Sequence, residues 1–214
     1  MKKAVAFMPI RLNSQRIINK SIVDVLGRPM FCWSLESLDK LGIPVYVYTN
    51  EEKRLREVLD FETQNVVFLQ RPKKLDGHDT KGIDIYKSFA EQVESEVYLL
   101  THCTSPFVAT RTYQRVLNAI LKEGYDSSCT VERKQTFCWH NGEKLNFTTP
   151  RPKTQEIEPV FVETSAAYCY RRDVLKSNSR SATNHRLCET NSIESIDIDE
   201  QRDLEYIRHL GVRT

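Results

Sequence analysis

The stretch that decides the fold is the apolar run Ala4-Val5-Ala6-Phe7-Met8-Pro9-Ile10 and the segment that follows it, Arg11-Leu12-Asn13-Ser14-Gln15-Arg16-Ile17-Ile18-Asn19-Lys20. The apolar run has the length of one buried strand, and three cations follow it before any helical pattern begins. Ligands bind at strand ends in α/β folds, where a loop offers backbone N–H groups beside Arg and Lys side chains. We therefore interpret this segment as a loop that holds a triphosphate.

Composition excludes several classes of protein. The 214 residues carry 31 Lys and Arg against 29 Asp and Glu, so the near-neutral charge argues against nucleic acid or an acidic membrane as partner. The length fits one domain over residues 1–214, and the absence of a signal-peptide pattern leads us to expect a cytoplasmic protein. The six cysteines lack C-x-x-C spacing, so we expect buried, reduced thiols rather than a zinc site or a disulfide framework.

Strand-like runs and helix-like segments alternate along most of the chain. This alternation predicts right-handed crossovers and an α/β fold with a mostly parallel, doubly wound sheet flanked by helices. Asn50 is in position to cap the second expected helix. We expect strands at 4–10, 45–48, 66–69, 97–100, 128–131, 160–162 and 166–170, a loop at 177–184, and helices at 30–41, 51–59, 80–93, 111–122, 173–176 and 200–210.

Two aspartates near the end of the chain form a second candidate site. Ser195-Ile196-Asp197-Ile198-Asp199 alternates with period two, which predicts an extended segment with Asp197 and Asp199 on one face. Carboxylates so placed can serve one Mg²⁺, and Mg²⁺ beside a cationic loop suits metal-assisted phosphoryl or nucleotidyl transfer. In the alternative, Asp197 is an exposed strand residue and Asp199 is the N-cap of the last helix.

These segments resemble signatures of the acylneuraminate cytidylyltransferase family, whose members are also called CMP-sialic acid synthetases. Residues 11–21 are similar to R-x-x-S-K-R-[IL]-P-x-K-N, and residues 195–199 match S-I-D-I-D at every position. Three further segments resemble family motifs in the same order along essentially the whole chain. They are Arg71-Pro72 with Asp79-Thr80 for R-P…S-D-T, residues 104–106 for Q-P-T-S-P, and residues 161–170 for F-R-x-N-G-A-I-Y.

The resemblance implies a Rossmann-like fold of the nucleotide-diphospho-sugar transferase type and a reaction with Mg²⁺ as cofactor. In that reaction the anomeric hydroxyl of an acidic 2-keto-3-deoxy sugar attacks the α-phosphate of CTP, giving a CMP-sugar and pyrophosphate. By this likeness Arg11, Ser14 and Lys20 bind the triphosphate and the departing pyrophosphate. Asp197 and Asp199 hold Mg²⁺ and help to activate the attacking hydroxyl, so that Arg11, Lys20 and Asp199 are the expected catalytic residues.

Further residues are assigned to the nucleotide by the same likeness. Arg16, Arg71 and Asp79 are expected at the nucleotide, with Arg71 positioning the cytosine or the ribose. The alternatives are that Arg16 is a surface cation and that Arg71 only flanks a turn.

The residues expected at the sugar are His102, Thr104, Arg151, Thr164 and Tyr168. His102 stands where a sugar-contacting Gln is common in the family, and Thr164-Ser165 stands where Asn-Gly is common. The alternatives are a satisfied strand-end histidine for His102, a core aromatic for Tyr168 and a solvated loop charge for Arg151. Glu163 has no counterpart in the family pattern and is kept as a candidate sugar contact.

Residues 132–159 form an excursion from the α/β pattern. Asn141-Gly142 between short apolar runs predicts a small β-hairpin. The excursion lies where the family carries its dimerisation segment, so we expect a homodimer. Phe137, Trp139 and Phe147 would fit an interface, and they would equally fit a hairpin that covers itself.

The acceptor stays open at this point. Ile18 replaces a proline and Ser21 replaces an asparagine of the first signature, so the loop supports the reaction class more firmly than the substrate. A sialic acid-like sugar is the first interpretation, and Kdo, a Kdo-like sugar, pseudaminic acid or legionaminic acid are the alternatives. A non-catalytic nucleotide-binding homologue is the alternative from another class, against which the retained Arg11, Lys20 and Asp199 argue.

Overall fold

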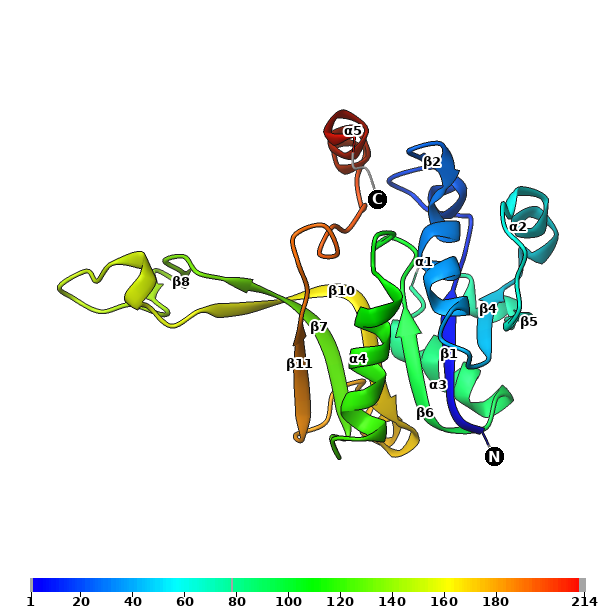
Figure 1. Cartoon of the computed structure of the whole chain (residues 1–214). Helices are drawn as coiled ribbons and strands as arrows, with labels where there is room; N and C mark the ends of the chain where they lie inside the picture. Colours follow the sequence, from blue (N-terminus) through cyan, green and yellow to red (C-terminus); the bar gives the residue numbers. More distant parts are fainter. Residues whose placement is uncertain (1, 78, 212–214) are drawn as a thin grey trace.

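The computed structural model describes residues 2–77 and 79–211, and its framework is a seven-stranded sheet with helices on both faces (Figure 1). The strand order is β11-β7-β10-β6-β1-β4-β5. The strands are β1 (Lys2–Pro9), β4 (Val45–Thr49), β5 (Val66–Gln70), β6 (Ser95–Thr101), β7 (Ser127–Lys134), β10 (Val160–Arg171) and β11 (His185–Glu189). The helices are α1 (Met30–Asp39), α2 (Glu52–Val58), α3 (Gly82–Gln92), α4 (Thr110–Leu121) and α5 (Gln201–Leu210).

Most neighbouring strands run parallel, as the β/α alternation predicted. β1 lies between β6 and β4 and is parallel to both, β5 is parallel to β4, and β11 is parallel to β7. β10 is antiparallel to both β6 and β7, between which it is inserted. The expected fold class, a mostly parallel sheet flanked by helices, is therefore confirmed.

Alternating side chains of β1 build the two layers of core. Ala6 and Met8 pack into the apolar cluster that includes side chains of α1 and α4, whereas Val5 and Phe7 pack into the cluster under α3. Phe7 stacks on Phe89 of α3 with ring centroids 4.2 Å apart. Because both faces of β1 are covered, the strand is buried. Its carboxyl end is therefore held in a fixed position, on the side of the sheet where the parallel strands end.

Four sequence-based expectations differ from the structure. Residues 160–171 form one strand with a β-bulge between Glu163 and Tyr168, where Ser165 has φ of 58°. β11 was not predicted, because its residues show neither an apolar run nor alternation, and only Cys188 is buried. Residues 196–199 form no strand. Asn50 does not cap α2, because its Oδ1 atom, which would have to accept from the helix, accepts from Gln70 Nε2 instead.

Residues 135–159 form an arm that projects from the sheet (Figure 1). β7 and β10 remain paired as far as Lys134 and Val160, and the arm carries the short hairpin β8 (Trp139–His140) and β9 (Glu143–Lys144). Positive φ angles of 50° at Asn141 and 82° at Gly142 give the two-residue turn that the Asn-Gly pair predicted. The arm begins three residues later than the expected excursion, because β7 is longer than expected.

Two further findings concern the cysteines and the helices. All six cysteines are free thiols, and five of them are buried, while Cys138 in the arm is half-buried. Within residues 2–77 and 79–211, no helix has both the length and the apolar character needed to cross a lipid bilayer.

A buried hydroxyl pair fixes the end of β6, and its removal gives a first prediction. Thr101 Oγ1 donates to the carbonyl of Ala166 at 2.9 Å and lies 2.9 Å from the hydroxyl of Tyr113. Tyr113→Phe should lower the free energy of unfolding by about 1 kcal/mol, because one buried hydrogen bond is lost. Urea denaturation measures this change, and Tyr206→Phe on the exposed face of α5 is the control that should show none.

Candidate active site

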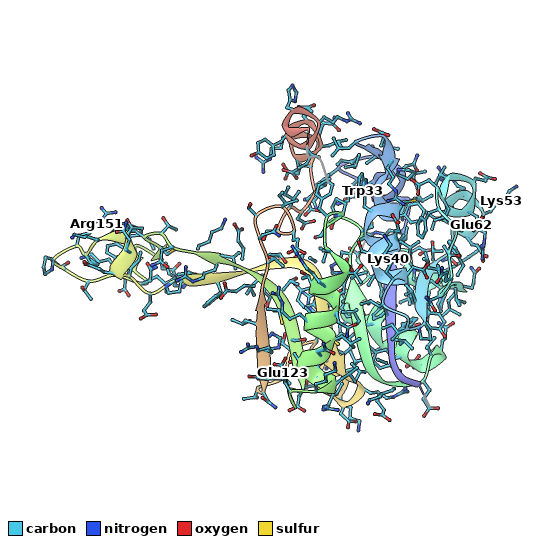
Figure 2. The ribbon with its side chains drawn as sticks, viewed as in Figure 1. Trp33, Lys40, Lys53, Glu62, Glu123 and Arg151 are labelled. Carbon is cyan, nitrogen blue, oxygen red and sulfur yellow. The ribbon has the colours of Figure 1, made fainter. Side chains whose placement is uncertain are left out.

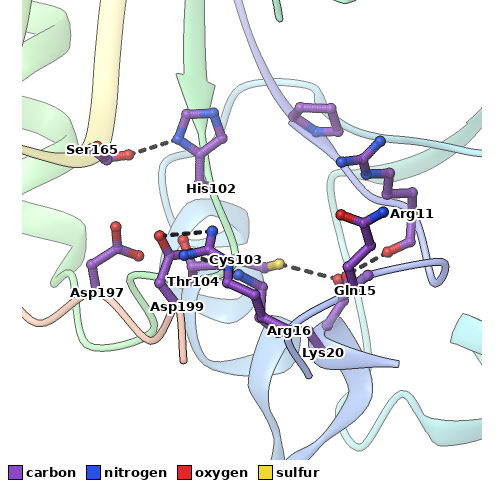
Figure 3. A pocket seen from close by; sticks show the side chains of 13 residues that line it. Arg11, Gln15, Arg16, Lys20, His102, Cys103, Thr104, Ser165, Asp197 and Asp199 are labelled. Atoms are coloured by element: carbon purple, nitrogen blue, oxygen red, sulfur yellow. Dashed lines mark hydrogen bonds and ion pairs between the residues drawn. The ribbon is translucent and has the colours of Figure 1, made fainter. Parts of the chain in front are cut away.

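A pocket of about 530 Å³ opens at the carboxyl ends of β1 and β6 (Figure 3). Four segments that are far apart in sequence meet there: the loop after β1, the exit of β6, the bulged part of β10, and the segment before α5. Its lining residues are Pro9, Arg11, Ser14, Gln15, Arg16, Lys20, Ser21, His102, Cys103, Thr104, Ser165, Asp197 and Asp199. The pocket therefore lies where ligands bind in α/β folds.

The loop after β1 is anchored by its apolar residues. Leu12 and Ile17 are 5% and 6% exposed and belong to the core, which leaves the polar residues of the loop to face the pocket. The Arg11 guanidinium donates to the carbonyl of Gly77 at 3.3 Å, and Asn19 takes a left-handed conformation with φ of 53° just before Lys20. The loop thus presents Arg11, Ser14, Arg16 and Lys20 on one side, as predicted from the sequence.

The cations of this loop pair with a carboxylate from the far end of the chain. Lys20 Nζ lies 2.7 Å from Asp199 Oδ1, and an Arg16 guanidinium nitrogen lies 3.2 Å from Asp199 Oδ2. Burial opposes ionisation of Asp199, but the hydrogen bond from Lys20 and the charges of Lys20 and Arg16 together lower the pKa of its carboxyl. Asp199 is not the N-cap of α5, because Glu200 holds that position.

Asp197 lies in a contrasting environment. Its Oδ1 atom is buried and has no hydrogen-bond partner in the described part of the chain. Burial raises the pKa of the Asp197 carboxyl, and repulsion from Asp199 adds to the rise, while a hydrogen bond from Thr104 acts against it. A buried carboxylate oxygen without a partner is costly, so it fits a site that a cation completes.

The donor set of the pocket suits Mg²⁺ held together with a substrate. Mg²⁺ is commonly bound by one or two carboxylates plus phosphate oxygens and water. Asp197 and Asp199 offer such a pair, and among residues 2–77 and 79–211 no three His, Cys, Asp or Glu side chains are grouped to hold a metal alone.

His102 forms the other end of the pocket and is held by its ring nitrogens. Nδ1 lies 2.7 Å from the carbonyl oxygen of Ser165, which can only accept, so Nδ1 carries the proton and Nε2 is left facing the Tyr86 hydroxyl at 3.5 Å. Burial lowers the pKa of His102, and the positive charge of Arg180 acts in the same direction. His102 is therefore a neutral wall whose nitrogens both face protein groups.

Not every residue expected at the site lines the pocket. Arg71 is 2% exposed and donates to Asp76 through Nε at 3.0 Å. Asp79 is exposed. The pocket loop contacts the segment that follows Arg71, because Arg11 donates to the carbonyl of Gly77 and Asn13 donates to the carbonyl of Asp76. Thr164 is buried and donates to Thr130 Oγ1 at 2.8 Å.

Two further expected residues lie outside the pocket. The Tyr168 hydroxyl donates to Glu163 at 2.9 Å, and Arg151 lies on the arm with its guanidinium 3.9 Å from the ring centroid of Phe137 (Figure 2). Roles for these residues stay predictions.

Four lining residues were given no role from the sequence, namely Pro9, Gln15, Ser21 and Cys103, whereas Ser165 belongs to the Thr164-Ser165 pair expected near the sugar. Gln15 lies inside the cationic loop and carries no charge that would have marked it. Ser165 occupies the left-handed position at which the family commonly has glycine, and this departure was the available signal. Cys103 donates through Sγ to the Ser21 hydroxyl at 3.4 Å, and burial raises the pKa of its thiol, so the pair forms a neutral floor.

A family model described as cytidylyltransferase matches residues 5–212 of the chain. The chain therefore belongs to the cytidylyltransferase family, and its recognition from the sequence as a divergent member is confirmed. It is 22% identical over 210 residues to N-acylneuraminate cytidylyltransferase A of Danio rerio, a match that covers 92% of the chain and 48% of the relative. The chain thus spans about half the length of that curated relative.

Two solved structures have the same fold. CMP:2-keto-3-deoxy-manno-octonic acid synthetase in complex with CTP matches with a TM-score of 0.66 and 20% identity over 98% of both chains. The 4-diphosphocytidyl-2C-methyl-D-erythritol synthase of Anaerococcus prevotii matches with a TM-score of 0.67 and 12% identity, covering 98% of this chain and 96% of the other. The Rossmann-like nucleotidyltransferase fold expected from the sequence is thereby confirmed.

The contrast between the two aspartates gives a second prediction. Asp197→Asn should raise the free energy of unfolding at neutral pH by about 1 kcal/mol, because an amide costs less than a carboxylate at a buried position without a partner. Asp199→Asn is the matched control and should change it by no more than about 0.5 kcal/mol, because the ion pairs of the half-exposed Asp199 are screened by water. A loss of stability in Asp197→Asn, measured by urea denaturation, would contradict the assignment.

Proposed function

We propose that this protein is a nucleotidyltransferase that uses CTP to activate an acidic 2-keto-3-deoxy sugar, releasing pyrophosphate and forming a CMP-sugar. The observation that carries the proposal is the meeting of Lys20 and Arg16 from the first loop with Asp199 from the last segment in one pocket. Membership of the cytidylyltransferase family supports the reaction class. The similarity to a synthetase bound to CTP supports the nucleotide.

The cationic loop would bind the triphosphate by exchanging partners. Lys20 and Arg16 neutralise Asp199 in the nucleotide-free chain, and phosphate oxygens can replace that carboxylate because they carry more charge and accept the same hydrogen bonds. Arg11 and Ser14 would bind further phosphate oxygens from the same loop. Lys20 and Arg11 would then stabilise the charge that develops on the departing pyrophosphate.

The two carboxylates would act together once Lys20 and Arg16 have moved from Asp199 to the phosphate oxygens. Asp197 and Asp199 would hold Mg²⁺, which when bound neutralises phosphate oxygens and favours loss of the proton from the attacking hydroxyl. The oxygen of the anomeric hydroxyl forms a bond to the α-phosphorus, and the bond from that phosphorus to the β-phosphate oxygen breaks. Asp199 would assist removal of the hydroxyl proton, while the electron pair of the broken bond would leave with pyrophosphate.

The acceptor is proposed to bind toward His102. Thr104 and Ser165 line the same end of the pocket, which leaves the cationic end to the triphosphate. Thr164 and Tyr168 flank the bulge that positions Ser165, so they would act on the sugar through the shape of this wall. A sialic acid-like sugar is our first choice, with Kdo, pseudaminic acid and legionaminic acid as alternatives.

Arg151 can contribute only if a second chain takes part, because it lies on the arm, away from the pocket of its own chain (Figure 2). We propose a homodimer in which the arm contacts the partner. Large apolar side chains along the arm and its base support this, since Trp139 is 58% exposed and Leu145 is 56% exposed. Phe137 and Phe147 instead pack on each other, with ring centroids 4.9 Å apart.

The dimer leads to a third prediction. Trp139→Asp combined with Leu145→Asp should shift the protein from dimer to monomer in sedimentation velocity, because the charges oppose burial of this surface. Leu187→Asp on the sheet edge at β11 is the control, as Leu187 is 42% exposed but lies outside the arm. A monomeric unsubstituted protein, or dissociation by Leu187→Asp alone, would reject the arm as the interface.

The proposed chemistry gives a fourth prediction. Incubation with CTP, Mg²⁺ and a panel of 2-keto-3-deoxy acid sugars should release pyrophosphate with at least one sugar. Lys20→Ala and Asp199→Asn should each lower this turnover by about a hundredfold or more, because each removes charge that the transition state needs. Lys40→Ala, which removes only an exposed helical ion pair with Glu36, should leave it unchanged (Figure 2).

Two outcomes would change the proposal. Binding of CTP without pyrophosphate release from any sugar would favour a non-catalytic nucleotide-binding homologue. Turnover near the unsubstituted rate in Lys20→Ala or Asp199→Asn would remove that residue from the mechanism.

A further inference from the structure

We propose that Arg180 and Glu163 form the specificity site that reads the end of the acceptor sugar farthest from its anomeric carbon. This inference rests on the proposed function and adds two residues to it. Arg180 belongs to the loop that precedes β11, and Glu163 lies in β10 at the base of the arm, two residues before the pocket residue Ser165. The resemblance to the family assigned no role to Arg180.

The Arg180 side chain is fixed in orientation. Its guanidinium carbon lies 3.5 Å from the ring centroid of Tyr168, and one terminal nitrogen donates to the Tyr86 hydroxyl at 3.4 Å. A guanidinium stacked on an aromatic ring keeps its N–H groups directed sideways in the plane, where they can donate to a ligand. Arg180 is thus a preorganised donor.

The ion pair between Arg180 and Glu163 is loose. The nearest nitrogen and oxygen are 3.8 Å apart, which is too long for a direct hydrogen bond, and the two side chains are 31% and 52% exposed. Glu163 Oε2 already accepts from the Tyr168 hydroxyl at 2.9 Å. A pair in this geometry contributes little to the stability of the fold. Arg180 can therefore still donate a hydrogen bond to a ligand, and Glu163 can still accept one from it.

The cluster is joined to the His102 end of the pocket. The Tyr86 hydroxyl that accepts from Arg180 lies 3.5 Å from His102 Nε2, and the Tyr168 ring makes an edge contact with the His102 ring at 6.2 Å between centroids. The pocket cations Arg11, Arg16 and Lys20 all come from the opposite segment. Arg180 and Glu163 therefore extend the acceptor end rather than the phosphate end.

The chemistry of the acceptor decides which of its groups can reach this cluster. In a 2-keto-3-deoxy acid the carboxylate is bonded to the carbon that carries the attacking hydroxyl, so it must stay beside the α-phosphate. Only the far substituents can extend from the pocket toward Arg180 and Glu163, and these are hydroxyl or acylamino groups. A donor beside an acceptor suits such groups, because a hydroxyl or amide both donates and accepts.

The test compares acceptors of different length with variants of the full chain. The probes are nine-carbon N-acetylneuraminate, eight-carbon Kdo and six-carbon 2-keto-3-deoxygluconate, with pyrophosphate release as the rate measurement. Arg180→Ala should raise KM for the long acceptor that the protein uses best by about tenfold or more, because a charge-assisted hydrogen bond is lost. The KM for CTP and the rate with the six-carbon acid should change less than twofold.

Two further variants separate recognition from a structural role. Arg180→Lys should recover part of the affinity for the long acceptor, and Arg186→Ala is the matched control, because Arg186 lies over the ring of Tyr125 at 5.7 Å outside the pocket. Glu163→Gln keeps an oxygen that can accept from the Tyr168 hydroxyl, but a neutral amide is a weaker acceptor for a sugar hydroxyl than a carboxylate. This variant should therefore raise KM for the long acceptor by a smaller factor than Arg180→Ala. Thermal unfolding of each variant confirms that it is folded.

The possible results separate failure of the specificity site from failure of the proposed function. If the unsubstituted protein turns over a long acceptor and Arg180→Ala leaves its KM unchanged, the specificity site is wrong and the proposed function stands. An equal loss for the long and the six-carbon acceptors would also overturn it, since that result marks a structural role. If the CTP-loaded protein neither turns over nor binds in calorimetry any of the three acids, or pseudaminic or legionaminic acid, the proposed function and this inference are both rejected.

Discussion

The site depends on one ion pair that joins the two ends of the sequence. Lys20 and Asp199 are 179 positions apart, yet their charged atoms are 2.7 Å from each other. The contact exists because β1 and β6 are neighbours in the sheet, and because the Ile198 backbone N–H donates to the carbonyl of Thr104 at 2.7 Å. Ile198 is fully buried in the core, so the last segment is fastened beside the exit of β6 before any ligand binds.

The same pair sets the electrostatic character of the pocket. At the cationic end, Asp199 forms ion pairs with both Lys20 and Arg16. The nearby Asp197 has one carboxylate oxygen without a hydrogen-bond partner among the residues that the structure describes. At the other end, burial and the charge of Arg180 lower the pKa of His102 and favour the neutral ring, although the hydrogen bond from Nδ1 to the Ser165 carbonyl acts against this. Charge is thus concentrated where a triphosphate would lie, and the opposite wall offers a neutral ring.

The sequence predicted those parts of the fold and site in which pattern and geometry coincide. The β/α alternation gave the mostly parallel sheet, and the charges of Arg11, Lys20 and Asp199 marked residues that do share a pocket. Asp197 and Asp199 also meet there, although the segment is not a strand, because the bond from Ile198 to Thr104 holds the intervening residue inward.

The misses arose where tertiary contacts override local pattern. The bulge at Ser165 breaks the period of two, so the directions of Thr164 and Tyr168 could not be counted along β10. Asn50 had the residue type of a helix cap, but Gln70 competes for its side-chain oxygen. The role of Arg71 at the nucleotide stays a prediction, but its buried contact with Asp76 is one that no spacing rule indicates.

The arm has a consequence for how such a chain can evolve. Pairing between β7 and β10 ends at Lys134 and Val160, so residues 135–159 set no register in the seven-stranded sheet. Insertions or deletions in that interval are absorbed at the tip, while the strands that carry the pocket keep their alignment. The length of the arm can therefore change under selection that is separate from selection on the pocket.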